Sequence, residues 1–270
     1  MRIAFLSDQH FGPRAFHDGK LRKLTDQAAA LTERFVERMN ASFRPDLVVN
    51  LGDVIEDESR ERDLAEYGKF LSILSGLDAR VVHVAGNHDQ ANLSDDDLRT
   101  LWGHSGELHY SVDLGGFRFV VLRTIEHKDT VIRLPEEQIA FAEQALARAP
   151  GPALVLMHHP ASDQDLSGNR WFEKRPHVCR VAERKALRRV LEASGKVRAV
   201  FNGHVHWNHF DVIRGIPYVT VQSLIENLDE DAPGRAAAAF AVCDLLPQRL
   251  LVTVHGAETA RYQFDWPLDG

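Results

Sequence analysis

The chain has 270 residues, of which 44% are apolar and 26% charged, and its formal net charge is −7. This length can bury a substantial core, and the composition is ordinary for a soluble globular protein. An acidic chain is a poor candidate for gripping the backbone of long DNA or RNA, although it still admits a small phosphorylated substrate.

The two cysteines and the lack of long apolar segments indicate the redox state and the location of the protein. Cys179 and Cys243 form no Cys-x-x-Cys pair, so a thiolate zinc site is not supported, and both thiols are expected to be reduced and structural. The N-terminus lacks the apolar region of a signal peptide, and no apolar stretch approaches the ~20 residues of a membrane span. We therefore expect a cytoplasmic protein without membrane association, built as a single domain over residues 1–270.

The first half of the chain alternates strand and helix patterns. Because strands separated by helices imply right-handed crossovers, this order predicts a largely parallel sheet. The predicted strands cover residues 3–7, 46–51 and 80–85, and the predicted helices cover 20–43 and 63–77.

The second half mixes hairpins with further helices and strands. Gly115 and Gly116 separate two strand patterns, at 107–112 and 117–123, which is a hairpin signal. The segment 161–178 lacks periodicity, and long irregular segments of this kind are often functional. The other predicted elements are helices at 135–149 and 181–193, strands at 153–157 and 197–202, and two antiparallel pairs, 209–213 with 218–222 and 238–243 with 250–254.

Five short motifs each follow an apolar run that reads as a strand. Their side chains are acids, amides and imidazoles, which bind divalent cations through oxygen and nitrogen. Each motif alone is weak, but five in order at strand ends indicate one metal site. They are Asp8-Gln9-His10, Gly52-Asp53, Gly86-Asn87-His88-Asp89, His158, and Gly203-His204-Val205-His206.

The spacing of these residues suggests how they share cations. Asp8 and His10 are two residues apart, so in an extended backbone both side chains point to one side. The same spacing joins His204 and His206, although each of these could serve a different metal. The carboxylate of Asp53 has two oxygens and can bridge two cations.

Several neighbouring residues have a plainer interpretation. His158 is preferred over His159 as the ligand because of the strand phase. Glu56 is expected behind the ligands, Asp57 in a surface run of acids, and His83 as a packed core histidine.

The five motifs together resemble the calcineurin-like metallophosphoesterase superfamily, and the resemblance extends from Asp8 to His206. Within that superfamily, the sequence most resembles the bacterial cyclic-nucleotide and glycerophosphodiester phosphodiesterase group. The resemblance implies that Asp53 bridges two divalent ions (Mn²⁺, Fe²⁺/Fe³⁺ or Zn²⁺). The implied ligands of the first ion are Asp8, His10, Asp53 and His206, and those of the second are Asp53, Asn87, His158 and His204.

The resemblance also implies the fold and the chemistry. The expected fold is a four-layer αββα sandwich, in which two mixed sheets are flanked by helices. A metal-bridging hydroxide would attack a small phosphodiester such as a cyclic nucleotide, while His88 protonates or stabilises the leaving oxygen and Asp89 orients His88. The alternatives are a phosphomonoesterase, then a nuclease, and last a scaffold that has lost catalysis. The sequence GNHD rather than GNHE argues against a protein phosphatase.

The substrate is the least determined part. An arginine suits a phosphate or carboxylate, and an aromatic ring suits a base or sugar face. The same loop residues could equally well pack on the domain without touching a substrate. The sequence is also compatible with a homodimer. The candidate substrate contacts are Arg14, His17, Asn169, Arg170, Trp171 and His209.

Overall fold

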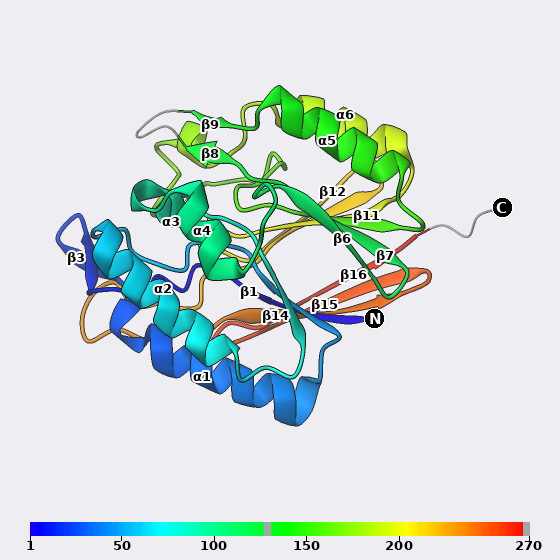
Figure 1. Ribbon diagram of the computed structural model, residues 1–270. Helices are drawn as coiled ribbons and strands as arrows, with labels where there is room; N and C mark the ends of the chain where they lie inside the picture. Colours follow the sequence, from blue (N-terminus) through cyan, green and yellow to red (C-terminus); the bar gives the residue numbers. More distant parts are fainter. Residues whose placement is uncertain (127–130, 267–270) are drawn as a thin grey trace.

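The computed structural model describes residues 1–126 and 131–266. Two six-stranded sheets pack face to face, and helices lie on both outer sides of the pair (Figure 1). Figure 1 shows α5 and α6 above the sheets and α1 and α2 below them. The expected four-layer αββα sandwich of mixed sheets is therefore confirmed.

The first sheet has the strand order β16-β15-β14-β1-β4-β5. Strand β1 pairs in parallel with β4, which pairs in parallel with β5, while β14, β15 and β16 run antiparallel to their neighbours. Its strands are β1 (Arg2–Leu6), β4 (Leu47–Asn50), β5 (Arg80–His83), β14 (Phe240–Leu246), β15 (Arg249–His255) and β16 (Ala260–Asp265).

The second sheet has the order β12-β13-β11-β10-β7-β6. Its four central strands are parallel, and β6 and β12 are antiparallel edge strands. Its strands are β6 (Tyr110–Leu114), β7 (Phe117–Val121), β10 (Ala153–Leu156), β11 (Val197–Asn202), β12 (His209–Ile213) and β13 (Ile216–Thr220).

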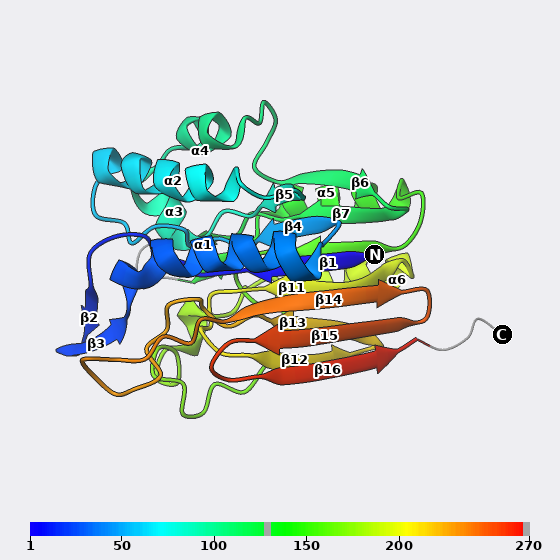
Figure 2. The ribbon, with the colours of Figure 1, turned by 90° about the horizontal axis from the view of Figure 1, so that it is seen from below.

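Helices cover the outer faces of both sheets. The first sheet packs against α1 (Ala28–Arg38), α2 (Arg60–Leu74) and α4 (Asp95–Trp102). Figure 2 shows α1 and α2 across the β1 side of this sheet, whereas β15 and β16 have no covering helix among those described. The second sheet packs against α5 (Glu136–Ala147) and α6 (Arg184–Ser194). Every helix in the described ranges is too short or too polar to span a bilayer.

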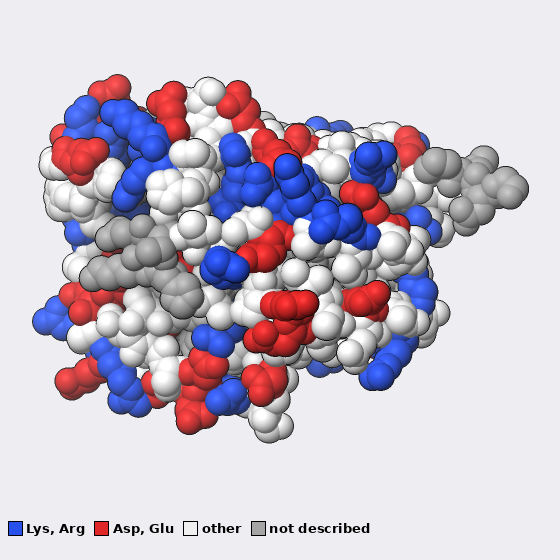
Figure 3. Space-filling view, turned by 90° about the horizontal axis from the view of Figure 1, so that it is seen from above, with Lys and Arg blue, Asp and Glu red and all other residues white. Residues whose placement is uncertain are grey.

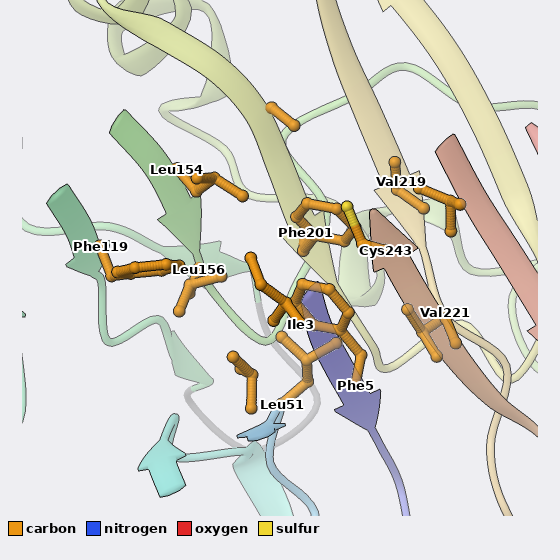
Figure 4. Close-up of a cluster of buried hydrophobic side chains, with 14 of the residues drawn as sticks. Ile3, Phe5, Leu51, Phe119, Leu154, Leu156, Phe201, Val219, Val221 and Cys243 are labelled. Atoms are coloured by element: carbon orange, nitrogen blue, oxygen red, sulfur yellow. The ribbon is translucent and has the colours of Figure 1, made fainter. Parts of the chain in front are cut away.

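The main core lies between the two sheets (Figure 4). Phe5 from β1 stacks on Phe201 from β11, with ring centroids 4.0 Å apart and an angle of 13° between the ring planes. Burial of one such side chain contributes about 1.5–3 kcal/mol. Because β1 and β11 both end at the candidate site, this stack fixes the distance between two of the motifs.

The segment 20–43, predicted as one helix, is wrong at its start. Residues Lys20–Lys23 form strand β3, which pairs with β2 (Ala15–His17) in a small hairpin. Leu21 is buried and its neighbours are partly exposed, which is strand alternation. A 3₁₀ turn (Thr25–Gln27) then leads into α1, and a π-helical turn (Met39–Phe43) follows it. Leu21 and Leu24 continue the helical spacing of the apolar residues that follow, so the periodicity alone could not show that the helix begins only at Ala28.

Some short elements were not predicted at all. The helices α3 (Asn87–Asn92) and α4 lie in an acidic stretch with few apolar residues, so their periodicity is weak. The elements β8 (Ile125–Glu126), β9 (Ile132–Arg133) and a 3₁₀ turn (Pro176–Val178) are shorter than any pattern can reveal. The edge strand β16 alternates cleanly but was overlooked.

Candidate metal centre

The five motifs follow the carboxyl ends of five parallel strands. These ends lie at the edge of the sandwich that is opposite the chain termini, on the left of Figure 1. Open α/β sheets characteristically bind ligands at this edge. The motif residues come from β1 (Asp8, His10), β4 (Asp53), β5 (Asn87, His88, Asp89), β10 (His158) and β11 (His204, His206).

The fold brings six of the seven candidate ligands into adjoining groups. Donor atoms of Asp8, His10 and His206 lie within 4.8 Å of one another, and so do those of Asp8, Asp53 and His158. His204 joins His158 in a third group, and its ring centroid lies 5.1 Å from that of His158. The members of these three groups are buried.

The backbone at these ligands is strained. Asp8, His10, Asp53, His204 and His206 all have positive φ, between 46° and 67°. The extended backbone expected for Asp8 and His10 is therefore wrong, and left-handed turns bring the side chains together instead. Such conformations cost of order 1–3 kcal/mol each and cluster at functional sites.

Two motif glycines are required by close packing. A Cβ atom on Gly86 would overlap the carboxylate of Asp53, and one on Gly203 would overlap the hydroxyl of Ser7. That hydroxyl donates a short hydrogen bond to Asp8. The glycines thus let neighbouring strand ends approach until their polar side chains meet.

Two histidines are oriented by backbone carbonyls. The Nδ1 atom of His158 donates to the carbonyl of Leu51 at 2.8 Å, and Nε2 of His204 donates to the carbonyl of Val178 at 3.0 Å. When the ring is neutral, its other nitrogen carries a lone pair. Carbonyl partners of this kind fix the tautomer that a metal ligand needs.

The other two histidines are oriented by buried carboxylates. Nδ1 of His10 lies 2.8 Å from Glu56, and Nδ1 of His206 lies 2.7 Å from Glu226. Their Nε2 atoms face each other at 3.2 Å. Glu56 lies behind the ligands, as predicted. Glu226 was missed, because it stands in an irregular segment after β13 with no motif around it.

Several donor atoms point inward and meet either no partner or only another candidate ligand. Asn87 Oδ1 is buried without a hydrogen-bond partner among the described residues. Asp8 Oδ1 lies 3.5 Å from Nε2 of His206, and His158 Nε2 lies 3.1 Å from Oδ2 of Asp53. Burying a polar atom unpaired costs about 1–3 kcal/mol. Oxygen and imidazole nitrogen donors without thiolates fit divalent cations such as Mn²⁺, Fe²⁺ or Zn²⁺. The residues present therefore fit a two-metal centre.

Electrostatics agrees with a cation at this place. Nε2 of His158 lies 3.1 Å from Oδ2 of Asp53. Burial opposes charge on His158, but Asp53 raises the pKa of this histidine to about 10. Burial likewise opposes charge on His206, but hydrogen bonds to Asp8 and Glu226 raise its pKa to about 9. The carboxylates thus stabilise positive charge among them.

The orientation of His88 differs from the expectation. Its Nδ1 atom lies 3.1 Å from Oδ1 of Asp57, so Asp57, and not Asp89, is the partner seen in the described structure. Asp57 is therefore not merely part of a surface run. The His88 side chain is 24% exposed and faces the open side of the centre, with its ring 4.7 Å from that of His10.

Asp89 instead ties two strand ends together. Its carboxylate accepts backbone N–H groups of Gly86, Asp53 and Val54 at 2.8–2.9 Å. As the third residue of α3, Asp89 points back toward the helix N-terminus, where free N–H groups lie. This direction takes the carboxylate away from the ring of His88.

A cavity of about 780 Å³ opens over the centre. Its floor includes Asp53, Asn87, His88, His204 and His206. This volume suits a small organic phosphate rather than a single ion. The rest of its wall comes from the β2–β3 hairpin, α3, β8, the segment 171–178, and the side chains of Glu56, Asp57 and Arg123.

Two of the candidate substrate contacts, His17 and Trp171, line this cavity. Their rings are 4.9 Å apart. Lys23 and Arg175 also line the cavity and were missed. Lys23 was hidden in a predicted helix, and Arg175 lies in a segment without periodicity.

The other four candidates are occupied elsewhere and do not line the cavity. Arg14 pairs with Asp26 on the surface, and His209 lies 3.2 Å from Asp211. Asn169 is buried, donates to the carbonyl of Val205, and accepts two N–H groups of its own loop. Arg170 donates to the carbonyl of Asn227. These four side chains stabilise loops.

Comparison with known families and proteins agrees with this geometry. The family model described as calcineurin-like phosphoesterase matches residues 1–208. The chain is 27% identical to a probable cyclic nucleotide phosphodiesterase of Synechococcus sp., over 76% of this chain and 73% of that one. It is 28% identical to the 3′,5′-cyclic adenosine monophosphate phosphodiesterase CpdA of Pseudomonas aeruginosa, over 78% and 71%. It is also 27% identical to the mouse serine/threonine-protein phosphatase CPPED1, over 79% and 70%.

Solved structures share the fold. A dimetal phosphatase from Danio rerio superimposes with a TM-score of 0.78 at 17% identity, covering 98% of this chain and 99% of that one. A purple acid phosphatase from yellow lupin superimposes with a TM-score of 0.66 at 15% identity, covering 98% and 53%. At these identities, the likeness concerns the arrangement of sheets and helices.

Proposed function

The chain belongs to the calcineurin-like phosphoesterase family, and from that premise we propose that it is a metal-dependent phosphodiesterase for cyclic nucleotides or other small phosphodiesters. One observation carries the proposal. Six of the seven candidate ligands form adjoining groups of buried donors, and their histidines are held by partners on the far side of each ring. Four of the seven, Asp53, Asn87, His204 and His206, line a cavity of about 780 Å³.

We propose that the seven residues hold two ions. Asp8, His10 and His206 would hold the first, and Asn87, His158 and His204 the second, with Asp53 shared. Support for the shared role comes from Asp53 lying within reach of ligands of both ions, 4.0 Å from Nε2 of His10 and 3.1 Å from Nε2 of His158. The candidate ions are Mn²⁺, Fe²⁺/Fe³⁺ and Zn²⁺, because the mixture of imidazole, carboxylate and amide donors suits each of them.

The chain's own groups supply the rest of the reaction. Two divalent ions, when bound, activate water and neutralise phosphoryl oxygens. His88 lies beside the ligands and on the cavity wall, so its free Nε2 can donate a proton to the leaving oxygen. Asp57 holds the other ring nitrogen and fixes the direction of that donation.

The preference for diesters rests on the relatives. Two of the bacterial proteins described above are named as cyclic nucleotide phosphodiesterases. Monoester hydrolysis is the second candidate, because the mouse relative of similar identity is named a protein phosphatase. A protein substrate is less favoured, because the cavity is walled by the hairpin and by the segment 171–178.

The nuclease and scaffold alternatives have less support. Lys and Arg gather over α6 in Figure 3, but Asp and Glu lie beside them, and Arg184 and Arg188 both pair with Asp163. That face is therefore not a continuous track for a nucleic-acid backbone. All seven ligand positions and His88 carry residues able to function, which argues against a scaffold.

A substrate panel tests the proposal. Purified protein with Mn²⁺ is assayed on 3′,5′-cyclic AMP, 2′,3′-cyclic AMP, glycerophosphodiesters, bis(p-nitrophenyl) phosphate and the matching monoesters. We expect the highest kcat/KM on a diester and no activity with excess chelator. Higher kcat/KM on monoesters would favour the second candidate, and inactivity with every divalent ion would refute the enzyme proposal.

Four further properties remain proposals. We propose one domain, because both sheets bury side chains in the same core. A cytoplasmic location and a small phosphorylated partner molecule follow from the proposed substrate, and cell fractionation tests the location. Light scattering tests whether the chain forms a homodimer.

A further inference from the structure

The segment 161–178, which we call the pocket loop, does two things at once. Its residues Trp171, Phe172, Arg175 and Val178 line the cavity. The same loop packs against the turn that carries His204 and His206, where Phe172 lies with its ring 4.6 Å from that of His204. The wall of the substrate cavity is therefore also the backing of two candidate ligands.

Two backbone contacts join the pocket loop to this turn. Nδ2 of Asn169 donates to the carbonyl of Val205 at 3.1 Å, and Nε2 of His204 donates to the carbonyl of Val178 at 3.0 Å. The first contact holds the loop to the peptide between the two histidines. The second places a loop carbonyl directly behind a candidate ligand.

The third contact runs through a side chain outside every motif, Glu226. Its Oε2 atom lies 2.7 Å from Nδ1 of His206, and the same carboxylate accepts Nε1–H of Trp171 at 3.2–3.3 Å. Glu226 is 3% exposed. A buried carboxylate persists only when its oxygens are paired. Glu226 finds its partners in one candidate ligand, in one cavity residue and in the guanidinium of Arg170, whose Nε lies 3.7 Å from Oε1.

Trp171 lies between the metal centre and the cavity. Its ring lies 5.4 Å from the ring of His206 and 4.9 Å from the ring of His17, which also lines the cavity. Nζ of Lys23 lies 5.5 Å from the centre of the indole ring. The indole thus forms cavity wall with its ring while its N–H is held by the carboxylate behind the metal centre.

We infer that Glu226 is a positioning residue that couples metal occupancy at His206 to the placement of Trp171 in the cavity wall. The inference rests on the proposed two-metal function. A carboxylate behind a metal-bound imidazole strengthens the ligand and fixes its ring. The same hydrogen bonds hold Trp171, so ordering of one partner favours ordering of the other, and the coupling acts in both directions.

Glu226 and Glu56 differ in what they connect. Glu56 also orients a candidate ligand, but its second partner is Lys23 of the hairpin. Only Glu226, among the described residues, joins a ligand histidine to the pocket loop by a side-chain hydrogen bond to that loop's tryptophan. This makes Glu226 the position at which a change of metal affinity and a change of loop mobility should occur together.

The first test measures metal binding without turnover. Mn²⁺ is titrated into metal-free wild type and Glu226→Gln by calorimetry. We expect two bound ions in both, with one affinity lowered about 10-fold in the variant and the other unchanged. The matched control is Glu173→Gln, because Glu173 lies in the same loop and accepts Gly168 N–H but contacts no candidate ligand.

The second test keeps the carboxylate intact. Trp171→Phe retains an aromatic ring but removes the N–H that Glu226 accepts. In wild type, Mn²⁺ should slow hydrogen exchange of the pocket loop, and in Trp171→Phe this slowing should be reduced. The control is Trp207→Phe. The side chain of Trp207 packs with Leu166, Cys179 and Val205 rather than with Glu226.

The outcomes separate the two proposals. Failure of the wild type to bind Mn²⁺ would refute the two-metal function, and the coupling with it. Two normal affinities in folded Glu226→Gln, or full Mn²⁺ protection of the loop in Trp171→Phe, would overturn the coupling alone. If Glu226→Gln does not fold, the exchange measurement on Trp171→Phe decides.

Discussion

The ammonium group of Lys23 lies 3.0 Å from Oε2 of Glu56 in the protein interior, where the two side chains are 7% and 14% exposed. The same carboxylate oxygen lies 2.8 Å from Nδ1 of His10. Burial opposes charge on Glu56, but Lys23 and His10 hold its pKa well below the ordinary value. A lysine in the hairpin thus stabilises the charge that orients a candidate metal ligand.

Replacing Lys23 should destabilise the fold. Lys23→Met leaves the buried carboxylate of Glu56 without its cation, and breaking a buried pair from one side costs about 3 kcal/mol. Urea unfolding measures the difference. Lys20→Met is the matched control on the same strand, because Lys20 pairs with Glu230 on the surface, where a pair contributes about 0–1 kcal/mol. Equal losses in the two variants would show that the buried pair has no special role.

His88→Ala should remove turnover and leave the metals in place. His88 lies on the cavity wall beside the ligands, and loss of a positioned proton donor lowers kcat by about 10²–10⁴-fold. The measurements are kcat on the best substrate and metal content by elemental analysis. His104→Ala, a change at a partly exposed histidine bonded to the carbonyl of Glu107, should alter neither. Loss of metal from His88→Ala would mean that His88 is a ligand.

Asp57 and Asp89 should fail in different ways. Asp57→Asn weakens the partner of His88 and should lower kcat by about 10-fold with little change in stability. Asp89→Asn replaces a carboxylate that accepts three backbone N–H groups, so it should cost about 1–3 kcal/mol of stability. Kinetics and urea unfolding of both variants check this. A loss of kcat confined to Asp89→Asn would restore the role first expected of Asp89.

The strand ends were accessible to sequence reasoning for a physical reason. Each buried strand is an apolar run, and the first polar residues after it must lie at the sheet edge. That logic predicts Asp8, Asp53, His158 and His204 at one edge, where the structure has them. It says nothing of backbone direction within the turns, so the positive φ of Asp8 and His10 was missed.

The partners behind the ligands were out of reach for a different reason. Lys23 and Glu226 form an isolated backbone bridge although about two hundred residues separate them in the chain. Lys23 stood in a predicted helix and Glu226 stands in no periodic pattern, so neither was a candidate, and tertiary packing brings both to the centre. The partner of His88 was predicted to be Asp89 and is Asp57 for the same reason, because helix α3 decides which carboxylate points toward His88.

His83 should make stability depend on pH. Its ring stacks on Trp102 at 5.5 Å, and burial lowers its pKa from 6.5 to about 4. The fold therefore keeps the ring neutral, whereas the unfolded chain takes up a proton below pH 6.5. The stability from the neutral ring is complete above that value and is lost as pH falls toward 4, by about 2 kcal/mol after allowance for partial exposure.

His83→Phe tests this, because phenylalanine keeps the stack on Trp102 and cannot be protonated. Urea unfolding of metal-free protein is compared near neutral pH and at mildly acid pH. The loss of stability on acidification should be smaller in the variant than in the wild type. Parallel losses in the two proteins would show that His83 takes no part.

The central claim is that Asp53 joins two metal ions at the carboxyl ends of the strands. Anomalous diffraction from crystals grown with Mn²⁺ measures this directly. We predict two anomalous peaks from bound Mn²⁺ about 3.5–4 Å apart, with the Asp53 carboxylate between them. One peak at Asp8, His10 and His206 takes one side, and the other lies at Asn87, His158 and His204. A single peak, or two peaks that do not share Asp53, would contradict the account.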